Sequence, residues 1–533
     1  MRQENTTLVA HLQCDLLVIG GGINGVGIAR DAAGRGLKVI LCEKDDLAAH
    51  TSSASSKLIH GGLRYLEYYE FSLVRKALQE REDLMRIAPH IIRPLRFVMP
   101  YVTGLRPRWL LRCGLFLYDH LAQRDLLPGT LSCRLHECEV GESLRTALRY
   151  GFMYSDAWVD DARLVVLNAM DAQQRGAQIL TRTRCAELVA HDGRWRAQLR
   201  QQATGLGRSS GNLGAQAEAE HQTTRIEVDA ACVINASGAW VAEWHAKLTA
   251  GANAQKIRLV KGSHIVVKSL FAHPNAYIFQ HPDGRIVFAI PYEKNYTLIG
   301  TTDMEFTGTP DQFKAQISTE EIAYLCHLSN QYFMQQITPQ DVLWSYAGVR
   351  PLVDDGKTDS KSVTRDYRLE LDLSQAPILH VFGGKITTYR RLAEDAMSLI
   401  AKPLSLTGKA WTKTALLPGG ALFSEHVSND NVLRRDAFIE TCCAQYAWIA
   451  PTLVRRLAAT YGSQLHKILE GCKVLADLGE QVLPELYACE IRYVMASEFA
   501  RTAQDILWRR TKLGLHMPND AEQILDAWLA RHT

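Results

Sequence analysis

The apolar positions of the first fifty residues follow the order strand, glycine turn, helix and strand. Residues 16–19 form a continuous apolar run, residues 23–33 carry small and apolar side chains at helical spacing, and residues 37–42 form a second run. Runs that are apolar throughout are typical of strands buried on both faces, as in a parallel sheet. The segment therefore predicts a βαβ unit of a Rossmann-like α/β domain.

Two further buried strands lie far along the chain, and each of them ends in a glycine turn. The run at 230–240 ends on Ser237-Gly238, and a later run ends on Gly383-Gly384 before a helix. In an open α/β sheet, ligands bind at the carboxyl ends of the strands. We therefore expect the glycine turns to lie together around one ligand.

Stretches rich in β-branched residues separate these segments. They lie at 261–271, 284–303 and 367–373 and indicate the strands of an antiparallel substrate domain. After Pro403, apolar residues recur three and four positions apart, which predicts a C-terminal helical domain over 405–533. The expected fold class is thus α/β plus α+β.

Composition and charge exclude several classes of function. The chain has 533 residues and a formal net charge of +3, so no global positive field favours a nucleic acid as partner. Its twelve cysteines form no Cys-x-x-Cys pair, which argues against structural metal and disulfides and favours a reducing cytoplasm.

Residues 1–13 lack the apolar core of a secretory signal, and we expect a flexible terminus. Residues 201–222, rich in Gly, Ser and Gln, predict an exposed loop. The chain contains no window of about 18 apolar residues free of charge, so we expect no transmembrane helix.

The glycine turn after the first strand has the spacing of a dinucleotide fingerprint. In Gly20-x-Gly22-x-x-Gly25 the first glycine allows the tight turn, the second lets the backbone approach a pyrophosphate, and the third lets helix and strand pack closely. Glu43 ends the second strand, where an acid accepts hydrogen bonds from the adenosine ribose. Because an acid at this position disfavours a 2′-phosphate, FAD and NAD are the candidates.

The loop TSSASSKLIHGGLRYLE at 51–67 follows this unit closely. It contains four serines, two glycines, a histidine and an arginine, without helical or strand periodicity. In a nicotinamide enzyme the βαβ unit usually continues into further α/β repeats, whereas here a Ser- and Gly-rich loop returns at once. The loop therefore favours FAD, laid across a domain interface, over NAD.

The fingerprint and this loop resemble the FAD-dependent glycerol-3-phosphate dehydrogenases of the aerobic respiratory branch. The resemblance covers nearly the whole chain in the family's order, through YSDAWVDDARLV (154–165), VKGSHIVV (260–267), IGTTD (299–303), YAGVRPL (346–352), TRDY (364–367), VFGGKITTYRRLAE (381–394) and DILWRRTKLGL (505–515). It implies oxidation of sn-glycerol 3-phosphate to dihydroxyacetone phosphate. Electrons are then expected to pass through FAD to ubiquinone at the inner face of the cytoplasmic membrane.

The resemblance also implies how the chain is divided. A Rossmann-like FAD-binding domain, of the glutathione-reductase and D-amino-acid-oxidase type, is expected from segments at about 14–80, 150–245 and 340–404. A substrate-binding cap with an antiparallel sheet is expected at about 81–149 and 246–339, followed by the helical domain.

The fingerprint, the loop and the family motifs predict the residues that hold FAD. Ser55, Ser56 and Lys57 are expected at the pyrophosphate and ribityl chain, and Gly61 and Gly62 beneath the isoalloxazine ring. The predicted set is Gly20, Gly22, Asn24, Gly25, Glu43, Ser55, Ser56, Lys57, His60, Gly61, Gly62, Ala186, Ala236, Ser237, Gly238, Gly348, Gly384, Lys385, Ile386 and Thr387.

The phosphate of the substrate calls for cationic side chains. A guanidinium offers a planar fork of donors that suits a phosphate. Arg64, Arg350 and Arg365 lie in family motifs, and Tyr65 adds a hydroxyl. We expect all four to bind the substrate.

The oxidation also needs a base for the hydroxyl proton and positive charge near the reduced flavin. His264 is the first candidate for the base, because imidazole titrates near neutral pH; His60 is its competitor. Lys385 precedes a helix and is expected to stabilise the reduced flavin or to bind the substrate phosphate. His264, Arg350 and Lys385 are thus the catalytic candidates, and all three are also expected to contact the substrate.

The run at 105–124 predicts a contact with the membrane surface. It has Trp109, several leucines and Phe116 flanked by four arginines, the composition of an interfacial helix. A helix that packs into the core is the alternative.

Several alternatives stay open from the sequence. A glycerol-3-phosphate oxidase that gives electrons to oxygen shares the fold and the substrate, and a noncatalytic FAD-binding sensor or scaffold is a more remote alternative. The apolar helical faces after residue 405 agree equally with a homodimer contact and with burial against the rest of the chain.

Overall fold

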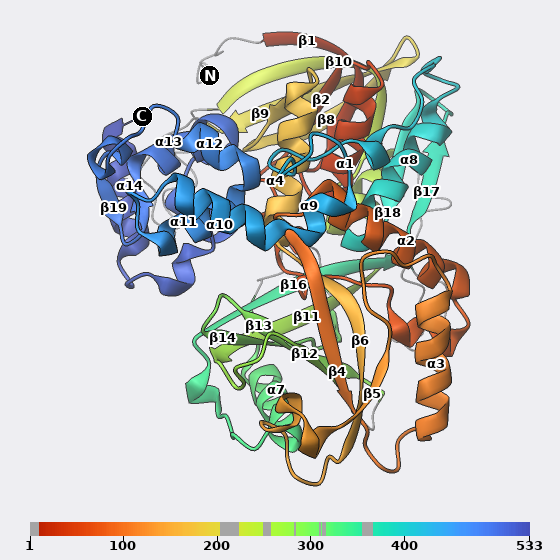
Figure 1. Ribbon diagram of the computed structural model, residues 1–533. Helices are drawn as coiled ribbons and strands as arrows, with labels where there is room; N and C mark the ends of the chain where they lie inside the picture. Colours follow the sequence, from red (N-terminus) through yellow and green to blue (C-terminus); the bar gives the residue numbers. More distant parts are fainter. Residues whose placement is uncertain are drawn as a thin grey trace.

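The computed structural model describes residues 10–202, 223–248, 257–281, 284–306, 308, 311, 316–353 and 366–532. The described residues form two large sheets, one above the other in Figure 1, and a group of helices near the C-terminus that lies beside them. The upper sheet contains the predicted cofactor segments, and the lower sheet is the cap.

The cofactor sheet has a parallel centre. β1 pairs in parallel with β2 and β10, and β10 pairs in parallel with β18, so the carboxyl ends of β1, β10 and β18 share one edge. α1 packs against α4 and α8. The predicted βαβ unit and the grouping of three glycine turns are confirmed. The strands, in spatial order, are β17 (Arg368–Asp372), β18 (Ile378–Phe382), β10 (Thr223–Asn235), β1 (Ala10–Ile19), β2 (Val39–Cys42) and β7 (Gln178–Leu180), with β9 (Arg194–Gln202) and β8 (Thr183–His191) continuing from β10; the helices are α1 (Ile23–Gly34), α4 (Asp161–Gln174) and α8 (Tyr389–Ile400).

The cap sheet is mainly antiparallel, and α7 (Thr319–Tyr332) packs against it. β16 runs along β11 from end to end, so that His264 lies opposite Tyr346 and Gly262 opposite Gly348. The strands are β15 (Met304–Phe306), β11 (Ile257–Lys268), β14 (Tyr296–Gly300), β13 (Ile286–Tyr292), β12 (Ala276–Gln280), β4 (Ile92–Pro100), β6 (Tyr150–Val159) and β3 (Leu58–Ile59), with β16 (Trp344–Val353) beside β11 and β5 (Leu131–Arg134) beside β6.

Four expected strand or terminus assignments differ from the sheets, and so does the two-residue strand β3, which lies within the expected cofactor segment at 14–80 but pairs antiparallel with β6 in the cap sheet. β6 pairs antiparallel with β4, and β16 pairs antiparallel with β11, so both strands belong to the cap sheet although they follow the expected borders at 150 and 340. β17, expected among the antiparallel cap strands, pairs with β18 in the cofactor sheet. Residues 10–13, expected in a flexible terminus, pair with β10 as the start of β1. In each of the four cases the sequence indicated a strand or a terminus, but the partner strand lies too far along the chain to be predicted. Of the predicted loop at 201–222, residues 201 and 202 belong to the end of β9, and residues 203–222 lie outside the described residues, as do residues 1–9.

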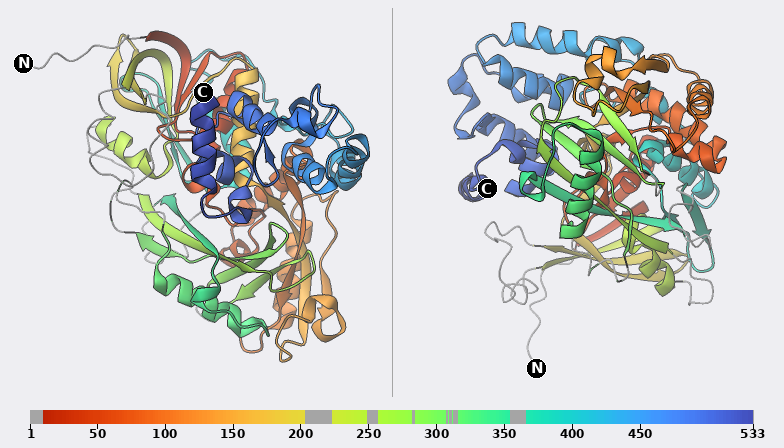
Figure 2. Two further views of the ribbon diagram at one scale, coloured as in Figure 1. Left: turned by 90° about the vertical axis from the view of Figure 1, so that its left-hand side faces the viewer. Right: turned by 90° about the horizontal axis from the view of Figure 1, so that it is seen from below.

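The C-terminal part is helical, as predicted, and it shares its core with the cofactor domain. One continuous apolar cluster contains Ile28 of α1, Val165 of α4, Leu457 of α11 and Leu525 of α14. Figure 2 shows these helices along the cofactor domain and next to the cap. Burial against the rest of the chain therefore accounts for their apolar faces. The main helices are α10 (Arg435–Gln445), α11 (Pro451–Tyr461), α13 (Ala488–Ser497) and α14 (Ala521–His532), and a π-helical turn spans Asp505–Arg510.

The predicted interfacial run forms α3 (Arg108–His120), which lies at the edge of the cap in Figure 1. Among the described helices, none combines the length and the apolar character that crossing a membrane requires.

Candidate functional site

The glycine turn after β1 has the geometry that the fingerprint predicts. Gly20 has a φ of +113°, and its amide donates a hydrogen bond of 2.9 Å to the Cys42 carbonyl. A Cβ on Gly25 would lie 1.9 Å from the Gly20 carbonyl oxygen, so a glycine is required where α1 approaches β1. The Ile23 amide at the start of α1 donates to Ser52 Oγ at 3.0 Å. Ser52, which the fingerprint does not include, thus joins the loop to this helix N-terminus.

Glu43 turns its carboxylate back toward the same turn. Its Oε2 accepts a hydrogen bond from the Gly21 amide at 2.6 Å, and its Oε1 accepts one from the Asp45 amide at 2.9 Å. Burial raises the pKa of Glu43, and the hydrogen bonds from Asp45 and Gly21 partly oppose that rise. A buried acceptor therefore stands beside bare backbone, as a ribose and a pyrophosphate require.

A cavity of about 370 Å³ opens at this edge of the sheet. The cavity is lined by the turn after β1, the end of β2, the start of β8 and the turn after β10. The narrow backbone at the glycines, the buried Glu43 acceptor and the N-terminus of α1 fit the adenosine and pyrophosphate of a dinucleotide. Predicted cofactor residues that line the cavity together are Gly20, Gly22, Glu43, Ala186, Ala236, Ser237 and Gly238.

The turn after β18 closes over the start of α1. Gly383 and Gly384 have φ values of +70° and +95°, and Asn24 Nδ2 donates to the Gly383 carbonyl at 3.1 Å. Asn24 Oδ1 is buried and, among the described residues, has no hydrogen-bond partner. A Cβ on Gly383 would lie 3.6 Å from the Pro351 carbonyl of β16. This turn therefore joins the cofactor domain to the cap.

The loop at 51–57 is bound to Asp161, at the start of α4. Lys57 Nζ forms a buried ion pair with both Asp161 carboxylate oxygens at 2.7 and 2.9 Å and also donates to the Ser53 carbonyl. Ser55 Oγ donates to Asp161 at 2.7 Å. Burial lowers the pKa of Lys57, and Asp161 opposes that shift. Both side chains are thus engaged by an acid that the sequence did not identify as a partner, and the expected contacts of Ser55 and Lys57 with the cofactor stay a prediction.

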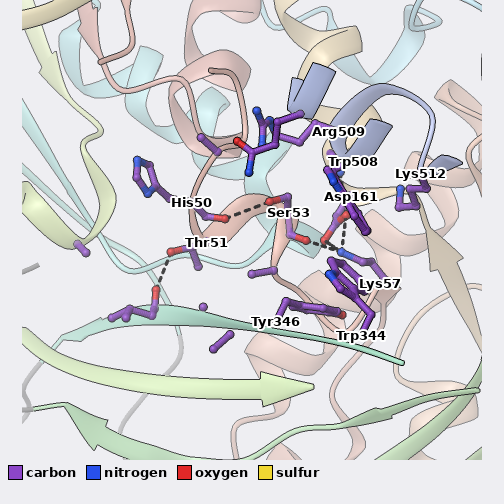
Figure 3. A pocket seen from close by; sticks show the side chains of 18 of the residues that line it. His50, Thr51, Ser53, Lys57, Asp161, Trp344, Tyr346, Trp508, Arg509 and Lys512 are labelled. Atoms are coloured by element: carbon purple, nitrogen blue, oxygen red, sulfur yellow. Dashed lines mark hydrogen bonds and ion pairs between the residues drawn. The ribbon is translucent and has the colours of Figure 1, made fainter. Parts of the chain in front are cut away.

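A second cavity of about 540 Å³ lies between this loop, β16 and the C-terminal segment around Trp508 (Figure 3). It shares His50, Thr51 and Trp240 with the first cavity. Of the predicted cofactor residues, Lys57 and Gly348 line it.

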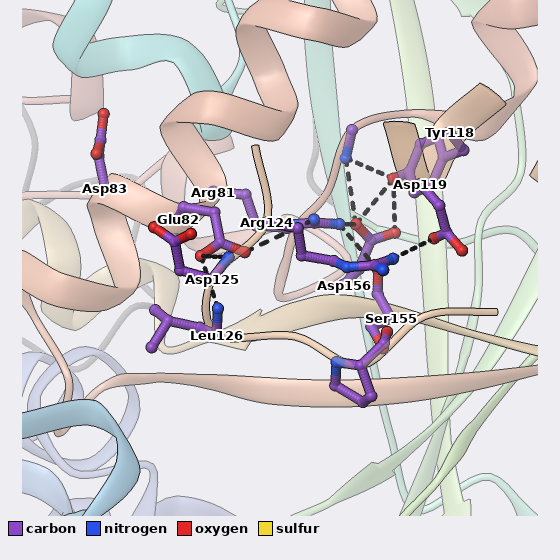
Figure 4. Close-up of polar contacts among 12 residues, drawn as sticks. Arg81, Glu82, Asp83, Tyr118, Asp119, Arg124, Asp125, Leu126, Ser155 and Asp156 are labelled. Atoms are coloured by element: carbon purple, nitrogen blue, oxygen red, sulfur yellow. Dashed lines mark hydrogen bonds and ion pairs between the residues drawn. The ribbon is translucent and has the colours of Figure 1, made fainter. Parts of the chain in front are cut away.

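The His60-Gly61-Gly62 turn is held from behind by a buried polar cluster (Figure 4). The Gly61 amide donates to the Tyr118 hydroxyl at 2.8 Å, Tyr118 donates to Asp156, and Asp156 forms an ion pair of 2.6 Å with Arg81. Burial raises the pKa of Asp156 and outweighs the opposing effect of Arg81. A Cβ on Gly61 would lie 2.5 Å from Leu78. Packing against Leu78 thus requires a glycine at position 61, as would any ring bound in front of it.

Two pairs of predicted residues meet in front of this turn. The His60 amide donates to Thr387 Oγ1 at 3.3 Å, and Lys385 Nζ lies 3.8 Å from the centre of the Tyr65 ring. Ile386 is half-buried at the start of the same short helical turn as Thr387. The loop and the turn after β18 therefore form one wall.

His264 is buried on β11, on the face of the cap sheet that the loop covers. Its Nε2 shares a hydrogen bond of 2.9 Å with Ser56 Oγ, and its ring stacks on Tyr346 with 4.8 Å between centroids. Burial, with Arg350 and Lys57 nearby, lowers the pKa of His264 well below its usual range. The imidazole is therefore neutral near pH 7, so that one of its ring nitrogens carries no proton. The side chain of Ser56 faces this ring, and its expected contact with the cofactor stays a prediction.

Arg350 extends from β16 on the same face. Its guanidinium pairs with Asp303 and donates to Thr301 Oγ1 at 3.1 Å. A Cβ on Gly262 would lie 2.5 Å from Arg350 Nη2, so glycine leaves the room that this side chain occupies.

The structure defines the contacts of the other two predicted arginines less fully than those of Arg350. Arg64 Nη2 donates to the Tyr68 hydroxyl at 3.3 Å. Arg365 lies outside the described residues. Tyr65, Lys385, Thr387 and His60 therefore lie together through the contacts described above, whereas Arg64 contacts Tyr68.

The sequence missed several residues that hold the site. Ser52, within the loop, accepts a hydrogen bond from the Ile23 amide of α1. Tyr118, Asp156 and Asp161 bind backbone or side chains of the predicted loop. The family motif at 154–165 contains Asp156 and Asp161 and could have pointed to these two acids. The motif does not indicate which side chains they bind.

Comparison with known proteins adds the family. Residues 15–390 match the family of FAD dependent oxidoreductases, and residues 410–530 match the C-terminal domain of alpha-glycerophosphate oxidase. The chain is 48% identical over 518 residues to a glycerol-3-phosphate dehydrogenase of Pseudomonas aeruginosa, covering 97% of this chain and 94% of the relative. It is 46% identical over 516 residues to a D-erythritol 1-phosphate dehydrogenase of Brucella abortus, covering 97% of each. The X-ray structure of a glycerol-3-phosphate dehydrogenase from Bacillus halodurans, complexed with FAD, is similar with a TM-score of 0.74 at 26% identity, over 98% of this chain and 90% of that one.

Proposed function

Because this chain belongs to the FAD-dependent oxidoreductases, among the relatives of the glycerol-3-phosphate dehydrogenases, we propose that it oxidises sn-glycerol 3-phosphate to dihydroxyacetone phosphate. The observation that carries the proposal is the neutral, buried imidazole of His264 on the same sheet face as the Arg350 guanidinium. A proton acceptor beside a phosphate-binding cation is what the oxidation of a phosphorylated alcohol needs.

The residues around the first cavity and the turn after β18 would hold FAD. Gly20 and Gly22 leave backbone bare for the pyrophosphate, and Glu43 offers an acceptor for the ribose. Lys385 stands before a helical turn whose amides add positive potential. FAD, when bound, supplies the acceptor for the hydride from carbon 2 of the substrate.

The substrate is bound and deprotonated by the chain's own side chains. Arg350, with Arg64 and Lys385, supplies positive charge for the phosphate, and Tyr65 supplies a hydroxyl. His264 accepts the proton from the substrate hydroxyl, and Ser56 fixes one ring nitrogen at 2.9 Å. His60 has a different place, since its amide is bound to Thr387 and its ring lies edge-on to Phe288. We therefore prefer His264 over His60 as the base.

D-erythritol 1-phosphate is a second candidate substrate. The relative from Brucella abortus that bears this activity in its name is 46% identical, nearly as similar as the relative from Pseudomonas aeruginosa. Both compounds are primary phosphates with a neighbouring secondary alcohol, so the same charges serve both.

Anaerobic flavin bleaching tests the proposal. The yellow protein, mixed without oxygen with sn-glycerol 3-phosphate, should lose its visible flavin absorbance, and glycerol should leave it unchanged. Faster bleaching by D-erythritol 1-phosphate would assign the second substrate instead. Absence of bleaching by both would contradict the proposal and support a noncatalytic flavoprotein.

We propose ubiquinone as the electron acceptor. Reduced protein should transfer electrons to a ubiquinone analogue faster than to oxygen. Stoichiometric peroxide in air, with little quinone reduction, would make the protein an oxidase.

A quinone acceptor implies contact with the cytoplasmic side of the membrane, and we propose α3 for that contact. Leu115 and Tyr118 face inward, while Trp109 and Phe116 are 68% and 60% exposed, and Arg108 and Arg112 are exposed beside them. An apolar face bordered by arginines is typical of a helix that lies in a membrane interface.

A further inference from the structure

The catalytic candidate His264 is joined to the C-terminal domain by a row of aromatic rings. The His264 ring stacks on Tyr346 at 4.8 Å and 14° between planes, Tyr346 lies 5.0 Å from Trp344, and Trp344 stacks on Trp508 at 4.8 Å and 18°. Tyr346 and Trp344 belong to β16, whereas Trp508 lies in the π-helical turn of the C-terminal domain. Figure 3 shows Tyr346, Trp344 and Trp508 on the same cavity.

His264 needs support from packing because it has few polar constraints. Its Nε2 is bound to Ser56, but its Nδ1 is buried and has no hydrogen-bond partner among the described residues. One hydrogen bond leaves the ring free to tilt about that contact. The edge of the ring lies against Gly300, where a Cβ would be 2.1 Å from Cδ2, and the flat face is fixed by Tyr346.

Tyr346 also supports the partner of His264. Its hydroxyl donates to the Ser55 carbonyl at 2.7 Å, directly before Ser56. A displacement of Tyr346 would therefore disturb both the stacked face of His264 and the hydrogen bond at Nε2.

The outer end of the row is held firmly. Trp508 Nε1 donates to Glu522 Oε1 at 2.8 Å, and a Cβ on Gly514 would lie 2.6 Å from the indole, so the chain closes onto the ring where no side chain intervenes. Arg510, two residues on, forms a buried two-point ion pair with Asp46 of the cofactor domain, at 2.6 and 2.8 Å. The position of Trp508 is thus set by the C-terminal domain and by its attachment to the cofactor domain.

We propose that Trp508 is a positioning residue for His264, which acts through the stacked rings of Trp344 and Tyr346. The C-terminal domain thereby contributes to proton transfer without contacting the substrate. The inference rests on the proposed function, since it takes His264 as the proton acceptor. Misplacement of a reacting group by about 1 Å costs on the order of 100-fold in rate, and a tilt transmitted through two rings should cost less.

The test measures the rate of anaerobic flavin reduction by sn-glycerol 3-phosphate. Trp508→Leu should lower this rate about tenfold with KM changed less than about threefold, because the phosphate-binding groups are untouched. Trp508→Phe, which keeps an aromatic face, should recover most of the rate. Trp528→Leu is the matched control, because Trp528 is a buried tryptophan of the same domain, with a hydrogen bond to Glu480, outside the row. Its rate should match the parent, whatever happens to its thermal stability.

A double-mutant cycle separates positioning from general damage. In the His264→Asn background, Trp508→Leu should have no further effect on the reduction rate, since the group it positions is gone. An equal tenfold loss in both backgrounds, or a loss in Trp528→Leu as large as in Trp508→Leu, would overturn the proposal. If His264→Asn alone leaves the rate unchanged, the assignment of the base fails, and that result differs from a failure of Trp508 alone. On the FAD-loaded protein, the circular dichroism signal of the stacked indoles should disappear in Trp508→Leu and persist in Trp528→Leu.

Discussion

The proposed adenosine end and the proposed substrate end of the site are built in different ways. At the adenosine end, short-range features decide the geometry: Gly20, Gly25 and Glu43 lie within one βαβ unit, and backbone atoms form most of the surface. At the substrate end, side chains from the loop, from β11 and β16 and from the turn after β18 meet, and each is fixed by a partner far along the chain. The first kind of geometry follows from spacing, whereas the second depends on tertiary pairing.

The largest effect is expected at the adenosine end, with Gly25→Val. Even the Cβ of the new side chain would lie 1.9 Å from the Gly20 carbonyl oxygen, so α1 must move away from β1. We expect FAD affinity to fall by about 100-fold or more, corresponding to roughly 3 kcal/mol, and a colourless preparation. The measurement is the flavin absorbance per protein after purification. Gly114→Ala in α3 is the control, because its Cβ would meet no atom within 4 Å, and it should stay yellow. A yellow Gly25→Val protein with normal FAD affinity would remove the strict packing requirement from this end.

At the substrate end, Arg350→Ala should keep the flavin and lose the substrate. Hydrogen bonds from a charged group contribute roughly 1.5–3 kcal/mol each, so kcat/KM for sn-glycerol 3-phosphate should fall about 100- to 1000-fold, mainly through KM. Steady-state kinetics at full FAD content provide the measurement. Asp303→Asn serves as the control, because it preserves the guanidinium and alters only its carboxylate partner. Unchanged saturation kinetics in Arg350→Ala would exclude Arg350 from the substrate site. That result would also weaken the contrast between a substrate end built from side chains and an adenosine end built from backbone.

How far each end could be predicted follows from the same difference. The βαβ unit, the three glycine turns at one edge and the position of seven residues at one cavity were predictable, because glycine spacing and strand order act locally. The residue types expected at the proposed substrate end follow from the chemistry of phosphate binding and proton transfer, and their roles stay a prediction. The partners were not predictable: Lys57 binds Asp161 across 104 positions, and Ser56 binds His264 across 208. Such pairs depend on which strands associate, and that is also why β6, β16 and β17 were assigned to the wrong sheet.

A smaller effect, on stability, is expected from the titration of His264. Its pKa in the folded protein is well below the ordinary value of about 6.5, chiefly through burial. As the pH falls below about 6.5, the unfolded chain therefore takes up a proton that the folded protein does not, and the free energy of unfolding decreases. The loss from this group is at most about 1.4 kcal/mol per pH unit.

The variant His264→Asn should remove that part of the slope. Its thermal midpoint, measured between about pH 7.5 and 5.5, should fall less steeply than that of the parent, even if it is lower at every pH. His136→Asn, which removes an exposed imidazole outside the loop, β11 and β16, is the control for the loss of a histidine as such. Parallel slopes for His264→Asn and the parent would mean that His264 binds protons equally in the folded and the unfolded protein, and would contradict the lowered pKa of the buried ring.

The smallest effect on the two ends is expected from changes on the outer face of α3. The inner face contacts the substrate end through Tyr118, which accepts a hydrogen bond from the Gly61 amide, whereas Trp109 and Phe116 point away from the fold. The double variant Trp109→Glu, Phe116→Glu should therefore reduce flavin with sn-glycerol 3-phosphate within about twofold of the parent rate, since no proposed substrate contact changes. It should lose most of its sedimentation with vesicles that contain anionic lipid, because two carboxylates replace apolar side chains at the interface. Leu433→Glu with Val474→Glu, at exposed apolar positions of the C-terminal part, is the matched control and should sediment like the parent. Equal sedimentation of both double variants would exclude α3 as the membrane contact, and a loss of flavin reduction in the α3 variant would show that its two faces are not independent.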